Sequence, residues 1–136
     1  MDKAIGIDFG LKRTGISISD DLGIIATPLK TVDSVNLMDE IQQLVDKSQI
    51  LTIIIGYPLN LNGRDTDITA NVRLFKSAVE KRFSQCKVEL YDERMTSKIA
   101  QQTLIQTVSK KKRKEKGRID RLSATIILQD YLSANS

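Results

Sequence analysis

The chain opens with Met1-Asp-Lys-Ala-Ile-Gly-Ile-Asp-Phe-Gly10, and this stretch indicates both the fold and the place of a site. The apolar run at 4–7 predicts a β-strand, and Asp8 follows at its carboxyl end. An ionised carboxylate there is costly if buried alone, so it needs a cation or several donors. Gly10 permits a sharp turn and the close approach of a ligand, and Arg13 is suited to bidentate phosphate binding. The stretch therefore suggests a metal and phosphate site; the alternative is a turn capped by Asp8.

The pattern beyond this stretch predicts a mixed sheet flanked by helices. Strands are expected at 4–8, 14–19, 24–29, 50–55 and 87–91. Two short connections make the first three strands an antiparallel meander, with Pro28 at a sheet edge. The almost wholly apolar run at 50–55 is typical of a parallel strand covered on both faces. Helices are expected after an N-cap at Ser34, over 68–83, over about 96–106 and over 118–132. The predicted fold is α/β: three antiparallel strands, then two parallel ones, with helices on both faces.

Composition restricts both the compartment and the chemistry. The 136 residues are expected to form a single domain, residues 1–136. No apolar run approaches the roughly 20 residues of a membrane helix, and the amino terminus does not resemble a signal peptide. Cys86 is the single cysteine, so no internal disulfide can form, and we expect a cytoplasmic protein with Cys86 buried or half-buried. Histidine is absent, which excludes Ser-His-Asp and Cys-His triads and histidine-ligated zinc.

Positive charge is concentrated in one segment. The formal net charge is +4, and residues 110–118 alone carry seven cations and one acid, +6 in total, which leaves −2 for the remainder. We expect a slightly acidic domain with a basic loop at about 108–118 that binds a polyanion. The alternative is a solvated loop without a ligand. The basic residues assigned to phosphate binding are Lys110, Lys111, Lys112, Arg113, Lys114 and Lys116.

Carboxylates recur where a ligand is expected in such a sheet, beyond the carboxyl ends of the central strands. Asp8 and either Asp92 or Glu93 follow neighbouring strands, and Asp120 lies near the start of the last predicted helix. Convergent oxygen ligands suit Mg²⁺ or Mn²⁺, and two such ions about 3.5–4 Å apart can drive phosphodiester hydrolysis. The alternatives are a helix-dipole role for Asp120 and an exposed ion-pair cluster at 92–94.

Four motifs in order carry a family resemblance across nearly the whole chain. They are Asp8-x-Gly10-x-x-Arg13-x-Gly15, Gly56-x-Pro58-Leu59-x-x-x-Gly63, Asp92-Glu93-Arg94-x-Thr96-Ser97, and Asp120-x-x-x-Ala124 with the ending Ile-Leu-Gln-Asp-Tyr-Leu. Together they resemble the YqgF/RuvX family of bacterial pre-16S rRNA nucleases, also described as Holliday junction resolvases. The resemblance implies an RNase H-like fold and a metal-dependent nuclease that matures the 5′ end of 16S rRNA.

Carried over by position, the resemblance assigns the catalytic and metal-binding roles. The catalytic acids are Asp8, Glu93 and Asp120, with Asp92 the competitor for the second metal ligand. The strand alternation alone does not choose between the two, and Glu93 is favoured for its longer reach. Gly10, Arg13 and Arg94 join the lysine-rich segment in substrate binding. Related resolvases carry a further acid where this chain has Gly117, so a second metal would be held weakly, by Asp92, or by substrate phosphates.

Several functions remain open at this stage. The first is a Mg²⁺- or Mn²⁺-dependent endonuclease acting on precursor 16S rRNA, with the ribosomal particle as a partner. The alternatives are a Holliday junction resolvase acting on structured DNA in recombination and repair, and a non-catalytic nucleic-acid-binding module. An ATPase of the actin and sugar-kinase type is set aside because those proteins bind ATP between two such domains. We expect no membrane partner, and a monomer or weak homodimer.

Overall fold

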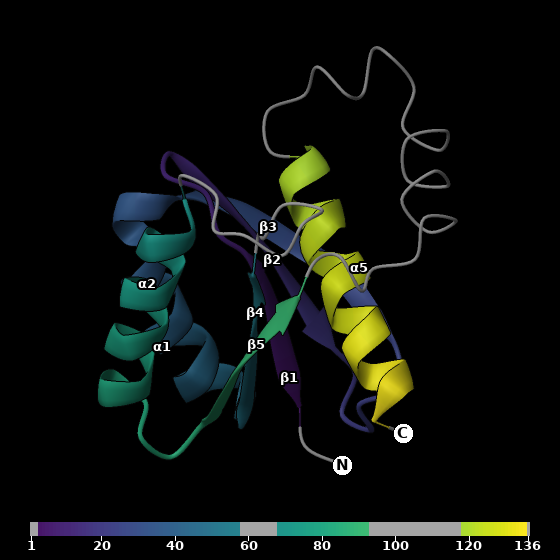
Figure 1. Ribbon diagram of the computed structural model, residues 1–136. Helices are drawn as coiled ribbons and strands as arrows, with labels where there is room; N and C mark the ends of the chain where they lie inside the picture. The colour runs from purple at the N-terminus through teal and green to yellow at the C-terminus, as the bar shows by residue number, and fades with distance from the viewer. Residues whose placement is uncertain (1–2, 58–67, 93–117, 136) are drawn as a thin grey trace.

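The computed structural model describes residues 3–57, 68–92 and 118–135, which are the coloured parts of Figure 1. They form a five-stranded sheet in the order β3-β2-β1-β4-β5. The strands are β1 (Ala4–Asp8), β2 (Arg13–Ser19), β3 (Ala26–Asp33), β4 (Thr52–Tyr57) and β5 (Lys87–Asp92). β1 pairs antiparallel with β2 and parallel with β4, and β4 is parallel to β5. The predicted mixed sheet is therefore confirmed.

Helices cover both faces of this sheet, as predicted. The short helix η1 (Ser34–Asn36), α1 (Leu37–Ser48) and α2 (Thr69–Arg82) lie on one face, and α5 (Arg118–Ala134) lies on the other. No helix in these described parts is long and apolar enough to cross a bilayer. The helix expected at about 96–106 and the basic loop at 108–118 fall outside the described residues, apart from Arg118 at the start of α5.

Alternation along the strands divides the apolar side chains between two cores. Ile5 and Ile7 of β1 point toward α1 and α2, where they join Ile53 and Ile55 of β4. Ala4 and Ile54 belong to the second core, under α5. Each central strand is thus covered on both faces, which explains why residues 50–55 show almost no polar alternation. The same alternation determines the face on which each strand-end acid lies.

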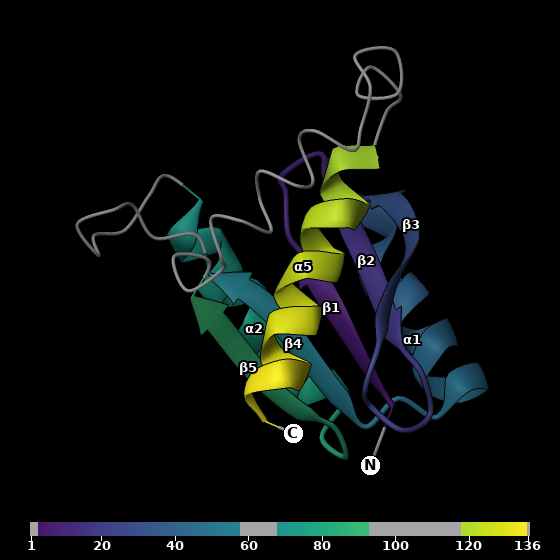
Figure 2. The same cartoon turned by 90° about the vertical axis from the view of Figure 1, so that its right-hand side faces the viewer.

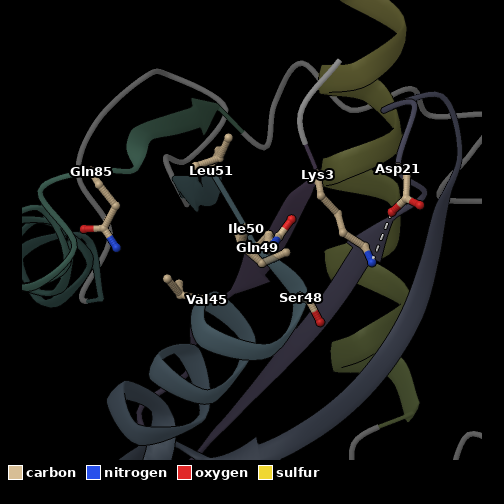
Figure 3. Close-up of a pocket in the computed structure, with 8 residues that line it drawn as sticks. All are labelled: Lys3, Asp21, Val45, Ser48, Gln49, Ile50, Leu51 and Gln85. Carbon is tan, nitrogen blue, oxygen red and sulfur yellow. Dashed lines mark ion pairs between the residues drawn. The ribbon is translucent and has the colours of Figure 1, made fainter.

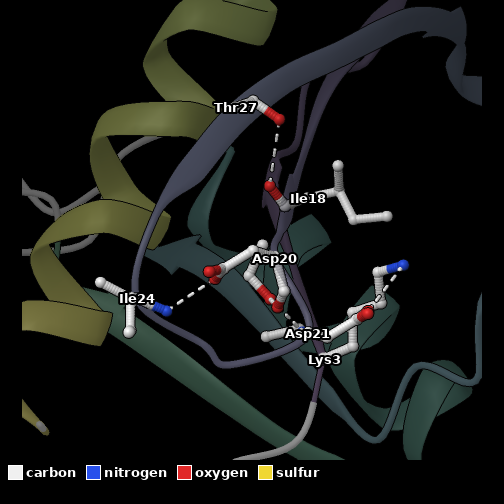
Figure 4. A network of polar contacts seen from close by, with 8 residues as sticks. Lys3, Ile18, Asp20, Asp21, Ile24 and Thr27 are labelled. Atoms are coloured by element: carbon white, nitrogen blue, oxygen red, sulfur yellow. Dashed lines mark hydrogen bonds and ion pairs between the residues drawn. The ribbon is translucent and has the colours of Figure 1, made fainter.

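The third strand begins two residues later than the sequence indicated, and it ends at Asp33 rather than Leu29. The Asp20 carboxylate accepts hydrogen bonds from the backbone N–H groups of Ile24 (2.7 Å) and Ile25 (3.1 Å). These bonds hold both residues in the turn after β2, so their N–H groups are not available for strand pairing; Figure 4 shows the bond to Ile24. The two amides also hold the pKa of Asp20 below its usual value.

The sheet edge formed by β3 carries the features expected of an edge. Pro28, which has no N–H to donate, pairs with Ser17, and the register shifts by one residue beside it. The shift leaves Leu29 without a partner position between Pro28 and Lys30, which makes a β-bulge. The prediction that Pro28 occupies an edge strand is confirmed.

Candidate active site at the carboxyl ends of the strands

The strand alternation separates the two described acids at the strand ends. Asp8 follows Gly6 by two residues, so it belongs to the face of β1 that α5 covers. On β5, Leu90 packs with the core under α1 and α2, whereas Tyr91 packs with the core under α5. Asp92 therefore belongs to the face opposite Asp8. The sequence left this open because it did not show which core each face of β5 meets.

Helix α5 sits unusually close to β1. The Ser17 hydroxyl on β2 donates a 2.8 Å hydrogen bond to the Ala124 carbonyl in the middle of α5. A Cβ on Gly6 would lie only 2.6 Å from Ser17 Oγ, 2.7 Å from Leu128 Cβ and 2.8 Å from Ala124 O. Only glycine allows the helix to approach this closely, which explains a glycine inside an otherwise apolar strand. We call the contact between Gly6, Ser17, Ala124 and Leu128 the helix seat.

The helix seat brings position 120 to the level of Asp8. Figure 2 shows that α5 runs opposite to β1. Accordingly, its later residues Tyr131 and Leu132 share a core with Ala4, while Ala124 lies against Gly6. Asp8 lies two residues beyond Gly6, about 6.6 Å further along the strand. Position 120 lies one turn before Ala124, about 6 Å back along the helix and on the same stripe. The two positions are therefore at nearly equal height on one face of the sheet.

The turn after Asp8 is tight and tied to its neighbours. A Cβ on Gly10 would lie 2.2 Å from the Arg13 carbonyl oxygen, so this position requires glycine. Phe9 stacks on Phe75 of α2 with the ring centroids 4.9 Å apart. Arg13 is exposed at the start of β2. It adjoins the Gly10 turn, five residues from Asp8 in sequence.

Ser34 has a different role from the one predicted. The expectation that it caps the following helix is wrong, because the residues at the N-cap positions of η1 and α1 are Asp33 and Asn36, neither with a side-chain cap bond. The Ser34 hydroxyl instead donates to the Gly10 carbonyl. It also lies 2.8 Å from the Thr14 hydroxyl. A serine before an amphipathic helix has the same sequence pattern in both roles, so the pattern could not separate them.

The remaining predicted site residues are placed in part or lie outside the described residues. The backbone of Asp120 belongs to α5. Among the side chains that the structure describes, those of residues 3–56, 68–92 and 121–135, no three acidic or cysteine residues gather into a group that could hold a metal. The predicted residues outside those ranges are Glu93, Arg94, Lys110, Lys111, Lys112, Arg113, Lys114 and Lys116.

A cavity in the described part of the chain lies away from these acids. Its volume is about 520 Å³, and its lining includes Lys3, Gln49, Leu51 and Gln85 (Figure 3). These residues precede β1, β4 and β5 or follow α1, so the cavity is at the amino-terminal end of the sheet. A paired Lys3 and Asp21, 3.4 Å apart, border it. The cavity is therefore not part of the candidate site.

A tyrosine pair anchors α5 to the far edge of the sheet. Tyr91 of β5 and Tyr131 of α5 meet edge to face, with ring centroids 6.4 Å apart. The Lys87 ammonium donates to the Tyr131 hydroxyl over 3.5 Å. Burial raises the pKa of both phenols, and Glu89 raises that of Tyr131 further. Both therefore stay neutral at physiological pH and serve the packing of α5.

Comparison with known proteins identifies the family. The model of the RuvX family, described as Holliday junction resolvase, matches residues 2–134. The chain belongs to the RuvX family. Relatives named "Putative pre-16S rRNA nuclease" include those of Flavobacterium johnsoniae, 40% identical over 98% of both chains, and Bacteroides thetaiotaomicron, 42% identical over 98% of both chains. A relative from Chlorobium chlorochromatii with that name is 36% identical over 96% of this chain and 94% of its own.

Solved structures place this RuvX chain in the RuvC-like group of RNase H folds. It superposes on "T. thermophilus RuvC in complex with Holliday junction substrate" with a TM-score of 0.61 at 12% identity, covering 98% of this chain and 96% of that one. A second structure of that RuvC gives a TM-score of 0.57 at 13% identity. At such low identity the likeness confirms the predicted fold and carries no information on substrate.

The sequence prediction missed the residues that position α5 and the Gly10 turn. Gly6 offered one signal, since a glycine within an apolar strand marks a close approach of another backbone. Thr14 and Ser17 gave none, because hydroxyl side chains within strands are common and their partners Ser34 and Ala124 are distant in sequence. The pattern at Ser34 fitted a helix N-cap equally well.

Proposed function

We propose that this RuvX chain is a metal-dependent endonuclease that hydrolyses phosphodiester bonds in the precursor of 16S rRNA. The observation that carries the proposal is the equal height of Asp8 and position 120 on the α5 face of the sheet. Two carboxylates at one level of the same face would repel each other, because like carboxylates in contact raise one another's pKa, and a divalent cation bound between them would compensate their charge. The names of the relatives support the RNA substrate.

We assign the metal-binding acids as Asp8, Glu93 and Asp120. Asp92 belongs to the face of β5 opposite Asp8, and Glu93, which follows the end of the strand in sequence, is left as the second ligand. Carboxylate oxygens are the ligands that Mg²⁺ and Mn²⁺ prefer, and the donor set contains no histidine or thiol. Bound there, a divalent ion would lower the pKa of a water and stabilise charge on the leaving oxygen.

The substrate backbone would be held by cations around this position. Arg13 adjoins the Gly10 turn, and we assign Arg94 and the basic residues at 110–116 to further phosphates. If about five phosphates are contacted, the logarithm of the affinity should fall with the logarithm of the salt concentration at about −0.7 to −0.9 per contact. Sequence readout is not expected, because aromatic residues are only 4% of the chain and stacking platforms are scarce.

The decisive experiment offers the purified protein a 5′-extended 16S precursor with Mn²⁺, in parallel with a four-way DNA junction. We expect cleavage of the RNA that EDTA abolishes. Asp8→Asn and Asp120→Asn should each lower the rate at least about a hundredfold, since even residues behind the ligands cost tenfold to a hundredfold. Asp130→Asn, on the same helix near its other end, is the matched control and should retain activity. Equal cleavage by Asp8→Asn and the wild type would refute the proposal.

Two outcomes would redirect the assignment. Cleavage of the junction in preference to the RNA would favour the DNA resolvase that the family description names. Metal-independent binding without any cleavage would favour a non-catalytic module, for which Gly117 in place of a further acid is the motivating observation. A pair of variants tests the second ligand: Glu93→Gln should abolish cleavage, and Asp92→Asn should not.

A further inference from the structure

Three residues, Gly10, Thr14 and Ser34, close a ring of hydrogen bonds. The Gly10 N–H donates to the Thr14 hydroxyl over 3.4 Å. The Ser34 hydroxyl donates to the Gly10 carbonyl. The Thr14 and Ser34 hydroxyls lie 2.8 Å apart, so both ends of the Gly10 residue are bound to one pair of side chains. Thr14 has no solvent exposure, and Ser34 is partly buried.

The geometry leaves only one direction for the protons. Ser34 has a single hydroxyl proton and gives it to the Gly10 carbonyl, which can only accept. The Thr14 hydroxyl must therefore donate to Ser34 and accept from the Gly10 N–H. Each hydroxyl donates once and accepts once, and hydrogen bonds arranged head to tail polarise one another. Removing either hydroxyl leaves Gly10 with an unpaired group in a part-buried site.

Further contacts extend this hold to the whole turn at 9–13, here called the Gly10 turn. The Ser34 backbone N–H donates to the Lys12 carbonyl over 2.8 Å, so Ser34 binds the turn at two residues. Phe9 is fixed on Phe75 at the other end of the turn. The turn thus joins Asp8 to Arg13 through a segment bound to α2 on one side and to the β3–η1 junction on the other.

We propose that Thr14 and Ser34 are positioning residues that hold the Gly10 turn in the shape in which Arg13 meets a substrate phosphate beside Asp8. The inference rests on the proposed nuclease function and adds to it two residues that touch neither metal nor substrate. A turn fixed before binding loses less entropy when the substrate arrives, so the ring should act on substrate affinity more than on the chemical step.

The test uses three variants with two readouts. Thr14→Val keeps the branched shape and removes the hydroxyl, while Thr14→Ser keeps the hydroxyl. Ser19→Ala is the matched control: Ser19 is a buried hydroxyl of the same strand that binds the Ala4 N–H (2.8 Å) and the Asp20 carbonyl (3.0 Å) at the opposite end of the sheet. The readouts are the hydrogen exchange rates of the amides of residues 9–13, and kcat and KM on precursor RNA.

We expect Thr14→Val to speed exchange of the Gly10 amide and to lower kcat/KM about tenfold, mainly by raising KM. This is the size of effect expected when one buried group, here the Gly10 N–H, loses its hydrogen-bond partner. Thr14→Ser should restore both values, and Ser19→Ala should lose comparable thermal stability with unchanged kinetics. Wild-type kinetics in Thr14→Val, or an equal loss in Ser19→Ala, would overturn the inference while leaving the nuclease function intact. A wild-type protein that cuts no precursor would instead refute the proposed function, and the exchange data would still report on the ring.

Discussion

Replacing Gly6 with alanine tests whether the helix seat determines the position of α5. The added Cβ would lie 2.6–2.8 Å from three heavy atoms, whereas relaxed contacts between nonbonded carbons lie near 3.5–4 Å. Two of these atoms, Leu128 Cβ and the Ala124 carbonyl oxygen, belong to a packed helix and cannot rotate away. The helix must therefore move by about 1 Å. That movement breaks the hydrogen bond between the Ser17 hydroxyl and the Ala124 carbonyl.

Gly6→Ala should lower the free energy of unfolding through overpacking and through the lost hydrogen bond. Overpacking in a core costs about 1–3 kcal/mol, and the lost hydrogen bond adds about 1 kcal/mol. The entropy of unfolding is about 2.1 cal/mol/K per residue. In a chain of this length, each kcal/mol of lost unfolding free energy therefore lowers Tm by about 3.5 °C. We therefore expect Gly6→Ala to lower Tm by about 7–14 °C, measured by circular dichroism without added metal. It should also lower Mn²⁺-dependent cleavage, because position 120 shifts relative to Asp8.

A control variant separates the shift of the helix from general destabilisation. Ile53→Ala removes a fully buried side chain on the other face of the sheet and should cost about 2–5 kcal/mol. At a temperature well below both transitions, Ile53→Ala should retain its cleavage rate and Gly6→Ala should not. A Tm within about 2 °C of the wild type for Gly6→Ala would refute the reasoning, since it would mean that the seat has room for a methyl group.

Three further predictions concern single side chains. The amides of Ile24 and Ile25 lower the pKa of Asp20 in the folded chain. Its charge therefore stabilises the fold at pH values above the ordinary aspartate pKa of about 3.9, and this stabilisation is lost as the pH falls through the depressed pKa. Asp20→Asn should therefore melt below the wild type at pH 7, with a gap that closes below about pH 4; a gap independent of pH would contradict this. Burial raises the pKa of Cys86, whose thiol donates to the Ile50 carbonyl, so iodoacetamide should label it much more slowly than a free thiol until urea unfolds the chain. Asp8→Asn should weaken Mn²⁺ binding in titration calorimetry while leaving the far-ultraviolet spectrum unchanged, and undiminished binding would exclude Asp8 as a ligand.

The periodicity of the sequence was sufficient to predict the sheet and the helices around it. Apolar strands covered on both faces and amphipathic helices follow directly from local patterns, so β1, β4 and α2 lie close to where they were expected. The errors arose where a side chain overrides the pattern. Asp20 holds Ile24 and Ile25 in a turn although both are strand formers, and Ser34 binds Gly10 in place of a helix end.

The candidate site was predictable as a set of acids but not as a geometry. The sequence placed Asp8 and Asp92 at strand ends and could not say that they face opposite cores. That information lies in the packing of Leu90 and Tyr91 against different helices, which is a tertiary property. The position of residue 120 relative to Asp8 likewise depends on the contact between Gly6 and Ala124. These residues are 118 apart in the chain, so no local pattern encodes their contact.

The helix seat also has a consequence for the order of events during synthesis. β1 is made first, yet the residues that meet Gly6 belong to the last helix described. A nascent chain must therefore emerge as far as Ala134 before α5 can dock and bring position 120 to the level of Asp8. On the proposed function, a chain in which α5 has not yet docked would lack nuclease activity, although β1 and its Asp8 are already made.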